Sequence, residues 1–364
     1  MAKTRVAVVF GGRSGEHEIS LASARSVLTA IDRDRYDVVP MAITREGRWI
    51  TGRDSLRLLG GDNREAPEVP PAKSGHLVTM AQSLVLSSAE GEDAVDVVFP
   101  VVHGTFGEDG TLQGLLEMAG LPYVGAGVLA SALGMDKALM KTVFRAHGLP
   151  TPDFVSFRNA EWRRGHDGLI DQIRTEIGYP CFVKPANMGS SVGVSKAHSL
   201  DELVAAVELA LEYDRKVIVE KAITAREIEC SVLGNDDPIA SVVGEIVPSN
   251  EFYDYQAKYA SDETELLIPA PLSAAQVAQV QQMAVKAFKV LDCEGMARVD
   301  FFLDRCSSEI YVNEVNTIPG FTAVSMYPKL WAASGLPYPE LIDRLISLAI
   351  ERHEQRKRLK TSVE

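Results

Sequence analysis

The chain has 364 residues, 46% of them hydrophobic and 24% charged, and a formal net charge of −13. This composition is typical of a globular protein of two or three domains, and its acidity argues against a nucleic-acid partner, because phosphate backbones require a basic surface. No run approaches the 18 apolar residues of a membrane-spanning helix, and the N-terminus lacks a signal-peptide pattern. We therefore expect a cytoplasmic protein, without membrane contact, that acts on a small molecule.

The first third of the chain alternates between strand and helix patterns. Apolar runs at 5–10, 36–43 and 95–102 predict buried strands, and residues 20–31 predict a helix. This order predicts a Rossmann-like α/β domain. Residues 60–92, rich in Gly, Pro, Ser and acidic residues, predict a surface excursion to which we assign no function. Two more helices are expected, one after HGTFGEDG that ends near Gly120 and one from Asp136 to near Gly148.

From residue 180 the pattern changes to a small mixed α+β arrangement. Strands are expected at 180–186, 193–197 and 216–220, with a helix opened by a capping box of Ser199 and Glu202. A strand at 226–234, a capping box of Ser273 and Gln276, strand-like runs at 295–303 and 309–316, and a helix from about 339 follow. The basic segment 351–360 is expected to be a solvated helix end.

The four cysteines lie far apart and show no C-x-x-C spacing. This pattern favours reduced thiols in the core over a disulfide framework or a metal site. They are Cys181, Cys230, Cys293 and Cys306.

The segment VKPANMGSSVGVSK, residues 183–196, carries small residues between two predicted strands. Glycines allow the backbone to approach a ligand closely, and hydroxyl and N–H groups can surround phosphate oxygens. Lys184 supplies positive charge. The spacing matches neither a Walker A loop nor a dinucleotide-binding turn. By itself, an ordinary Gly/Ser hairpin explains the segment equally well.

A second polar cluster lies more than a hundred residues further on. Arg298 and Asp300 are two apart in ARVDFFL, and Glu314 and Asn316 are two apart in IYVNEVN, so each pair shares one face of a strand. An antiparallel hairpin centred on residue 307 places Asp300 opposite Glu314 and Arg298 opposite Asn316. One face of the hairpin would then carry all four side chains.

Two opposed carboxylates need a positive partner. At 4 Å and an effective dielectric of 20 they repel by about 4 kcal/mol. Two carboxylates and an amide offer hard oxygen ligands, which favour Mg²⁺ over zinc. The alternative is a solvated hairpin face. Apolar residues at the intervening positions 297, 299 and 301 instead predict a buried strand.

A phosphate loop and a carboxylate pair on separate α+β segments imply a nucleotide held between them. The order VKPANMGSSVGVSK, VIVEKAI, REIE, ARVDFF and VNEVNTIPGFT resembles the ATP-grasp superfamily. The segments GGRSGEHEIS, HGTFGEDGTLQG and EFYDYQAKY are similar to motifs of the D-alanine–D-alanine ligase family, so the resemblance covers nearly the whole chain. It implies a Rossmann-like domain at 1–128 that binds the first substrate. A central α+β domain at 129–221 would carry the phosphate loop. A third domain at 222–364 would carry the magnesium site, a lid and the second-substrate site.

The resemblance also implies a reaction and its cofactors. ATP would phosphorylate the carboxylate of one D-alanine, and the amine of a second would attack the acyl phosphate to give D-alanyl-D-alanine for peptidoglycan precursors. ATP and Mg²⁺ are implied, with two ions and with Mn²⁺ able to substitute, in a homodimer formed through the first domain. A D-alanine–D-lactate ligase, a non-catalytic ATP-binding regulator and, from GGRSGEHE, a nicotinamide oxidoreductase remain alternatives.

The resemblance assigns roles to residues of this chain. Nucleotide contacts are implied for Lys137, Lys184, Ser190, Ser191, Glu220, Glu227 and Lys258. Catalytic roles are implied for Glu16, Ser190, Tyr259, Arg298 and Gly320. Substrate contacts are implied for Glu16, His103, Arg298, Gly320, Ser325 and Met326, and metal ligation for Asp300, Glu314 and Asn316.

Some of these residues have simpler explanations. Without the resemblance, His103 is a histidine that caps backbone at a helix start, and Glu16 favours a helix N-terminus through the macrodipole. Residues 250–259 are expected to form a mobile lid, or else an ordinary surface loop. Within the lid, Tyr259 favours D-alanine over D-lactate as the second substrate by resemblance. The base that deprotonates the attacking amine is left open.

Overall fold

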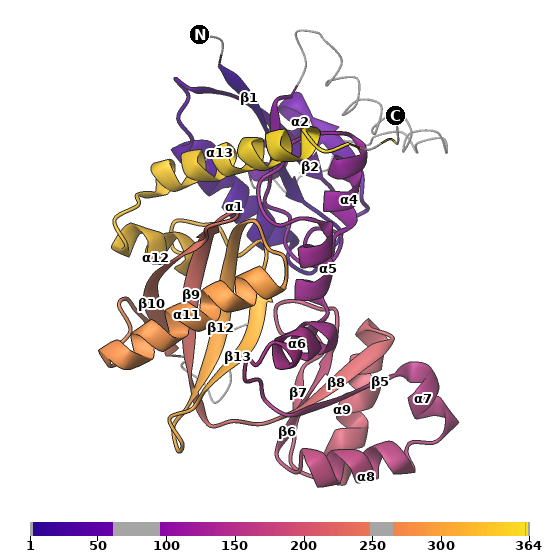
Figure 1. Ribbon diagram of the computed structural model, residues 1–364. Coiled ribbons are helices and arrows are strands. Elements are labelled where there is room, and N and C mark those ends of the chain that lie inside the picture. The colour runs from indigo at the N-terminus through magenta and orange to yellow at the C-terminus, as the bar shows by residue number, and fades with distance from the viewer. Residues whose placement is uncertain (1–2, 61–94, 248–264, 361, 363–364) are drawn as a thin grey trace.

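The computed structural model describes residues 3–60, 95–247, 265–360 and 362. Almost all of the predicted surface excursion at 60–92 and the whole predicted lid, with Lys258 and Tyr259, lie outside these residues. The described chain forms three sheets with helices packed around them (Figure 1). In the described residues, no helix combines the length and apolar character needed to cross a membrane.

The first sheet confirms the Rossmann-like prediction. Its strand order is β3-β2-β1-β4, with β1 parallel to β2 and β4, and β3 antiparallel to β2. The strands are β1 (Thr4–Gly11), β2 (Tyr36–Ile43), β3 (Trp49–Thr51) and β4 (Val97–Pro100). The helices are α1 (His17–Ala30), α2 (Gly52–Leu59) and α4 (Thr111–Met118). Helix α1 begins three residues before the predicted start, so Ser20 lies inside it, where its buried hydroxyl donates to the Val101 carbonyl.

The second sheet is antiparallel, in the order β5-β8-β6-β7. Its strands are β5 (Phe154–Arg158), β6 (Cys181–Pro185), β7 (Ser195–Ala197) and β8 (Lys216–Lys221). Helices α7 (Asn159–Arg164), α8 (Asp167–Glu176) and α9 (Leu200–Tyr213) accompany it. The Ser199 hydroxyl caps α9, but the Glu202 carboxylate accepts the N–H of His198 instead of Ser199, so the predicted capping box is only half formed.

The third sheet has the antiparallel order β11-β10-β9-β12-β13. Its strands are β9 (Ala225–Gly234), β10 (Ile239–Val247), β11 (Glu265–Leu267), β12 (Gly295–Asp304) and β13 (Ile310–Asn316). Helix α11 (Ala274–Val290) packs on one face and begins with the predicted capping box of Ser273 and Gln276. Helices α5 (Val128–Met135) and α6 (Lys137–Ala146) share its core. Helix α12 (Met326–Ala333) contacts β9 and β10.

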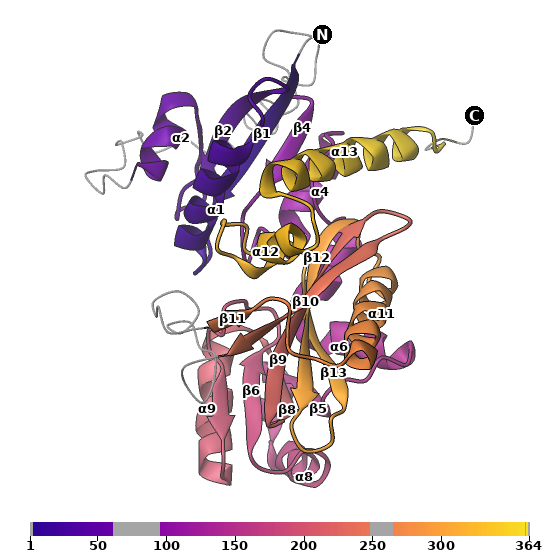
Figure 2. The ribbon, with the colours of Figure 1, turned by 90° about the vertical axis from the view of Figure 1, so that its left-hand side faces the viewer.

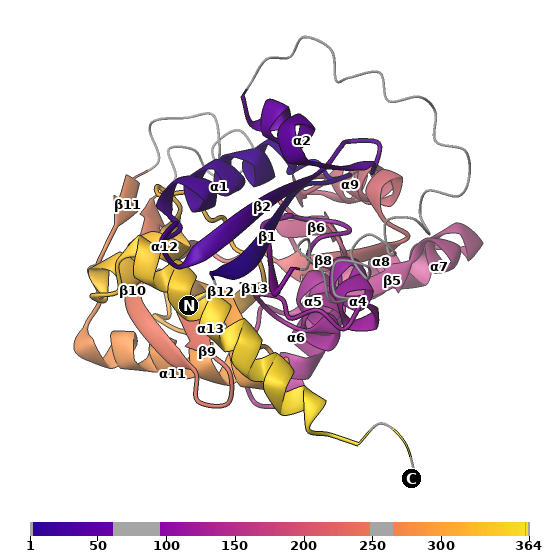
Figure 3. The ribbon, with the colours of Figure 1, turned by 90° about the horizontal axis from the view of Figure 1, so that it is seen from above.

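The last helix, α13 (Tyr338–Lys357), joins the first sheet to the third. It crosses between them in Figure 2, and its apolar residues share one core with β1, β4 and α1. Seen from above in Figure 3, it runs diagonally over the strands and ends near the C-terminus. The C-terminal end of the chain therefore covers a sheet built from its N-terminal end.

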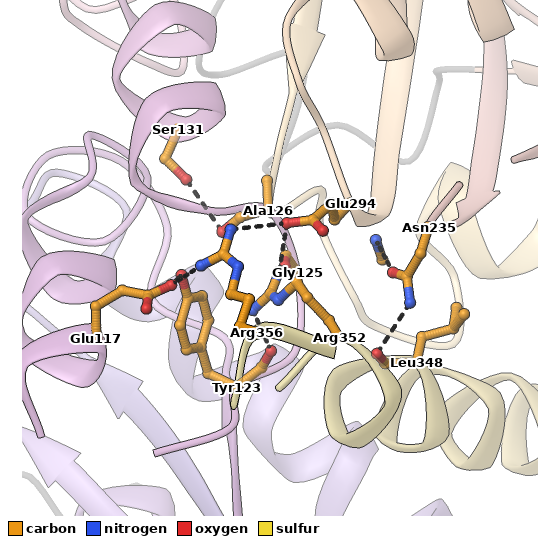
Figure 4. Close-up of polar contacts among 11 residues, drawn as sticks. Glu117, Tyr123, Gly125, Ala126, Ser131, Asn235, Glu294, Leu348, Arg352 and Arg356 are labelled. Carbon is orange, nitrogen blue, oxygen red and sulfur yellow. Dashed lines mark hydrogen bonds and ion pairs between the residues drawn. The ribbon is translucent and has the colours of Figure 1, made fainter. Parts of the chain in front are cut away.

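The prediction of a solvated basic end to this helix is confirmed for most of the segment 351–360, which is exposed, but it is wrong for Arg352. Arg352 is only 3% exposed, and its guanidinium donates to the carbonyls of Gly125 and Tyr123, the latter at 2.8 Å, as Figure 4 shows. It also lies over the Tyr123 ring, 4.2 Å from the centroid. Arg356 contacts Glu117 and lies 3.2 Å from Glu294. Arg352 and Arg356 therefore join α13 to the connection before α5 and to the residue before β12.

The cysteine prediction is right for three positions and wrong for one. Cys181, Cys230 and Cys293 are buried, whereas Cys306 is exposed in the turn between β12 and β13. All four are unpaired thiols. The apolar surroundings raise the pKa of the Cys230 thiol to about 12, which keeps it protonated and unreactive.

The buried guanidinium gives a stability prediction. Arg352→Met leaves two buried carbonyls without their charged donor, so we expect the free energy of unfolding to fall by about 3 kcal/mol. Arg358→Met, at an exposed position of the same helix end, should change it by less than about 0.5 kcal/mol. Urea unfolding followed by circular dichroism measures both variants. Equal midpoints for the two would contradict the role of Arg352.

Candidate active site

The small-residue loop after β6 holds strained backbone. Ser190 and Ser191 have positive φ values of 49° and 58°, a left-handed conformation that costs a non-glycine residue about 1–2 kcal/mol. Gly193, with φ 70°, has no room for a side chain, because a Cβ atom would lie 2.7 Å from the Tyr213 ring and 2.9 Å from Pro185. Strain of this kind is typical of ligand-binding loops.

Lys137 connects this loop to the hairpin of the third sheet. Asp136 caps α6 by accepting the Leu139 N–H, which places Lys137 in the first turn. The Lys137 ammonium donates to the Met188 carbonyl at 2.7 Å and lies 3.7 Å from a carboxylate oxygen of Glu314. One lysine therefore spans the two polar clusters that the sequence analysis singled out.

The register predicted for the hairpin is confirmed at both pairs. Asp300 on β12 is paired with Glu314 on β13, and Arg298 with Asn316. Beyond Asp300 a bulge shifts the register by one residue, so the hairpin is not centred on residue 307 throughout. The side chains of Arg298, Asp300 and Glu314 are 17%, 14% and 23% exposed, which argues against a fully solvated hairpin face. The intervening side chains of β12 are at most 1% exposed. They are Ala297, Val299 and Phe301.

The chain itself supplies positive charge to the opposed carboxylates. Arg298 donates two hydrogen bonds of 2.7 Å to the two oxygens of Asp300, and its Nε lies 3.0 Å from Glu229. The amide of Asn316 donates to Asp300 at 2.9 Å. Burial would lower the pKa of Arg298, but Asp300 and Glu229 outweigh it and hold that pKa well above its usual range. Arg298 therefore stays charged at any pH at which the protein is folded.

Glu229 was not among the site residues predicted from the sequence. It lies opposite Asp300 on β9, the neighbouring strand. Glu229 is two residues from Glu227 in REIEC, and residues two apart share one face of a strand. This spacing could have predicted that Glu229 belongs to the polar face. The polar face of the hairpin therefore extends onto β9.

A buried ion-pair cluster lies between helix α6 and the second sheet. Lys141 and Glu220 are 1% and 2% exposed at their side chains, and their charged atoms are 3.1 Å apart. The Lys184 ammonium donates to the other Glu220 oxygen at 2.7 Å. Burial raises the pKa of Glu220, but the two ammonium groups outweigh it and hold that pKa at about 2.

Lys141 was likewise not among the predicted site residues. It lies one helical turn after Lys137 on α6, so the spacing of four placed it on the same face. Burial lowers its pKa. A lysine on the apolar face of a helix was the signal that could have marked it as the partner of a buried carboxylate.

Glu16 reaches from the first domain to the phosphate loop. It precedes α1, but its side chain does not cap that helix and instead accepts the hydroxyl of Ser190. Gly104 and Gly189 pack against it so closely that a Cβ atom on either would lie 2.4 or 2.6 Å from a Glu16 oxygen. The position of Glu16 therefore depends on two glycines, Gly104 in the loop after β4 and Gly189 in the phosphate loop.

The remaining residues implied by the resemblance surround the loop after β13. His103 is buried and contacts the Ile318 carbonyl and the Ser23 hydroxyl, both at 2.9 Å. Gly320 lies beside Ser325, since a Cβ atom on the glycine would be 3.1 Å from the serine oxygen. Ser325 and Met326 stand at the start of α12.

Glu108, in HGTFGEDG, is a further residue that the sequence analysis did not single out. Its carboxylate accepts the Gly104 N–H at 2.7 Å and the Ile318 N–H at 3.0 Å. Burial and the nearby Glu16 raise its pKa to about 8, although the two N–H donors oppose the shift. Glu108 therefore ties the loop after β4 to the loop after β13.

The structure thus brings the hairpin, the phosphate loop and Glu16 together, with Lys137 and Ser190 making the connections. Among the described residues, no cluster of three or more His, Cys, Asp or Glu has the arrangement of a metal site. Two carboxylates and an amide nevertheless fit Mg²⁺, because all three offer hard oxygen donors and a bound phosphate and water can complete the shell. Three sheets with this site define a ligase of the ATP-grasp class.

Comparison with known proteins gives the family. Residues 5–126 match the family model described as D-ala D-ala ligase N-terminus, and residues 143–347 match the one described as D-ala D-ala ligase C-terminus. The D-alanine–D-alanine ligase of Geobacillus thermodenitrificans is 52% identical over 359 residues, covering 98% of each chain. That of Chloroherpeton thalassium is 51% identical over 362 residues, covering 98% of this chain and 99% of the other. The chain belongs to the D-alanine–D-alanine ligase family.

Solved structures agree in fold. The D-alanine–D-alanine ligase from Coxiella burnetii matches with a TM-score of 0.82 and 38% identity, covering 98% of this chain and 97% of the other. The VanG D-Ala:D-Ser ligase from Enterococcus faecalis matches with a TM-score of 0.81 and 38% identity, covering 96% of this chain and all of the other. Nearly the whole chain therefore shares its fold with these ligases.

The buried ion-pair cluster predicts a specific dependence of stability on pH. The pKa of Glu220 is about 2 in the folded protein against 4.5 for an ordinary glutamate, so its contribution to stability is complete above pH 4.5 and is lost as the pH falls towards 2. The difference in unfolding free energy between the wild type and Glu220→Gln should therefore narrow over this range. Urea titrations at several pH values measure it.

The exposed Glu212 on α9 provides the control. Glu212→Gln should differ from the wild type by a small amount that stays nearly constant over the same pH range. A difference for Glu220→Gln that also stays constant would contradict the assignment of this cluster as an ion pair.

Proposed function

We propose the roles by which the residues of this D-alanine–D-alanine ligase carry out its reaction. The enzyme joins two D-alanines for peptidoglycan precursor synthesis. The observation that carries the assignment of roles is the position of Lys137, which contacts the phosphate loop and approaches Glu314 of the hairpin. The loop and the carboxylate pair then act on one and the same nucleotide.

ATP lies between the second and third sheets in this proposal. Lys137, Lys184 and the loop serines Ser190 and Ser191 contact its phosphates. Lys184 has three N–H donors, so it can hold a phosphate oxygen while it keeps its hydrogen bond to Glu220. Together with Glu227, Glu220 lies towards the adenine and ribose.

Asp300, Glu314 and Asn316 are the proposed magnesium ligands, for two ions that Mn²⁺ can replace. A bound divalent cation neutralises the negative charge of the transferring phosphoryl group. The chain's own contribution is to hold the two carboxylates face to face, at a cost in repulsion that Arg298 and Lys137 reduce.

The first D-alanine lies with its ammonium at Glu16. Its carboxylate oxygen attacks the γ-phosphorus of ATP, and the bond to the oxygen bridging the β- and γ-phosphorus atoms breaks, so that ADP leaves with the electron pair. The amine of the second D-alanine then attacks the acyl carbon and loses a proton. Arg298 and the Gly320 N–H stabilise the oxyanion, and the tetrahedral intermediate collapses with loss of phosphate.

The second D-alanine lies near α12 in this proposal. Ser325 and the N–H of Met326, at the N-terminal end of that helix, contact its carboxylate, since unpaired N–H groups at a helix start favour an anion. Lys258 and Tyr259, which lie outside the described residues, are proposed to close over the phosphates and the first substrate. His103 is proposed to contact a substrate carboxylate, and its ring also contacts the Ile318 carbonyl and the Ser23 hydroxyl.

We also propose the larger organisation that the sequence analysis implied. The domain limits are 1–128, 129–221 and 222–364, and the chain forms a homodimer through its first domain. Its substrates are D-alanine and ATP, and it acts in the cytoplasm. Light scattering of the purified protein measures its oligomeric state.

Substrate use tests the proposed function directly. With ATP and Mg²⁺, the protein should release phosphate on addition of D-alanine and form D-alanyl-D-alanine, identified by mass. L-alanine, D-lactate and, given the resemblance to the VanG ligase, D-serine are run in parallel. Tight ATP binding without release in any mixture would instead indicate a regulator that does not turn over.

The proposed metal ligands make a second prediction. Glu314→Gln keeps the shape of the side chain but removes its charge, so we expect kcat to fall by more than about a hundredfold. Glu309→Gln, just before β13, serves as control because its carboxylate accepts a hydrogen bond from Tyr311 at the exposed end of the hairpin. Its kcat should stay within about twofold of the wild type. Equal activity of the two variants would remove Glu314 from the metal site.

A further inference from the structure

A buried serine of the first domain contacts the loop that carries the proposed oxyanion donor. Ser23 lies on α1 and is completely buried. Its hydroxyl oxygen is 2.9 Å from Nε2 of His103 and 3.2 Å from the backbone nitrogen of Phe321. Phe321 directly follows Gly320, so Ser23 connects the core of the first domain to the third.

The directions of these hydrogen bonds follow from their partners. The Ile318 carbonyl can only accept, so Nδ1 of His103, 2.9 Å away, must donate to it. Burial lowers the pKa of His103, which favours the neutral ring, and Nε2 is then an acceptor. The Ser23 hydroxyl therefore donates to Nε2 and accepts the Phe321 N–H. Every donor in this series of hydrogen bonds therefore faces an acceptor.

Backbone groups on both sides of Gly320 are fixed in this way. Before it, the Ile318 N–H donates to Glu108 and the Ile318 carbonyl accepts from His103. After it, the Phe321 N–H donates to Ser23. Pro319 has no N–H, and among the described residues none accepts a hydrogen bond from the Gly320 N–H. Within the segment 318–321, Gly320 alone keeps an N–H available for a substrate.

We propose that Ser23 is a positioning residue for the ligase reaction, which holds the Gly320 N–H towards the oxyanion through its contacts with His103 and Phe321. The inference rests on the proposed function and deepens it. A donor that is fixed before the reaction requires no reorganisation as charge develops on the substrate oxygen. The wild-type turnover with D-alanine tests the function, and the Ser23 comparison below tests the positioning role separately.

Helix α1 offers a matched control one turn away. Ser20 is also completely buried, and its hydroxyl donates to the Val101 carbonyl at 2.5 Å and accepts the Gly11 N–H at 2.7 Å. Both of its partners belong to the first domain. Ser20→Ala and Ser23→Ala therefore each remove one buried hydroxyl with two partners from the same helix, but only Ser23→Ala loosens the loop of Gly320.

The two variants should lower the urea midpoint to a similar extent and differ in catalysis. We expect Ser23→Ala to lower kcat by about tenfold to thirtyfold, less than complete loss of an oxyanion donor, with the KM for ATP within about twofold of the wild type. Ser20→Ala should keep kcat within about threefold. A phosphinate analogue of the dipeptide, which mimics the tetrahedral intermediate, should bind Ser23→Ala more weakly by the same factor as the loss in kcat/KM.

Equal kcat values for the two variants, or unchanged affinity of Ser23→Ala for the phosphinate, would overturn the positioning role. Should Ser23→Ala not fold, Ser23→Cys is the second variant, because it fills the same space and replaces a strong donor with a weak one. Its kcat should fall by about threefold to tenfold. A Ser23→Cys enzyme with the kcat of the wild type would likewise overturn the inference.

Discussion

The balance of charge around two opposed carboxylates is the constraint on which the rest of this structure depends. Asp300 and Glu314 face each other across β12 and β13, and their mutual repulsion has to be offset wherever the hairpin is buried. Arg298 and Lys137 offset it from two directions, and Lys137 also contacts the phosphate loop. Lys137 therefore has two effects: it reduces the repulsion between Asp300 and Glu314, and it brings the second and third sheets together at one site.

The first domain takes part through polar contacts that are partly or fully buried. Glu16 accepts the hydroxyl of Ser190 in the phosphate loop, and Glu108 accepts N–H groups from two different segments. Arg352 on α13 fixes the connection between the first sheet and α5. Because a buried polar group that loses its partner costs about 1–3 kcal/mol, such contacts specify one relative placement of the domains.

Sequence patterns predicted the parts of this site that depend on local periodicity. The register of Asp300 with Glu314 followed from residues two apart on strands with an apolar opposite face. The bulge beyond Asp300, the burial of Arg352 and the pairing of Lys141 with Glu220 did not follow, since each depends on segments that meet only in the folded chain. The domain limits and the residue roles stay predictions.

A crystal structure with ADP, Mg²⁺ and a phosphinate analogue of D-alanyl-D-alanine tests the central claim most directly. The account predicts an ion with oxygens of Asp300, Glu314 and Asn316 in its first shell, at about 2.0–2.1 Å. It also predicts the Gly320 N–H within hydrogen-bond distance of the phosphinate. An ion bound elsewhere, with Asp300 and Glu314 out of contact with it, would contradict the account.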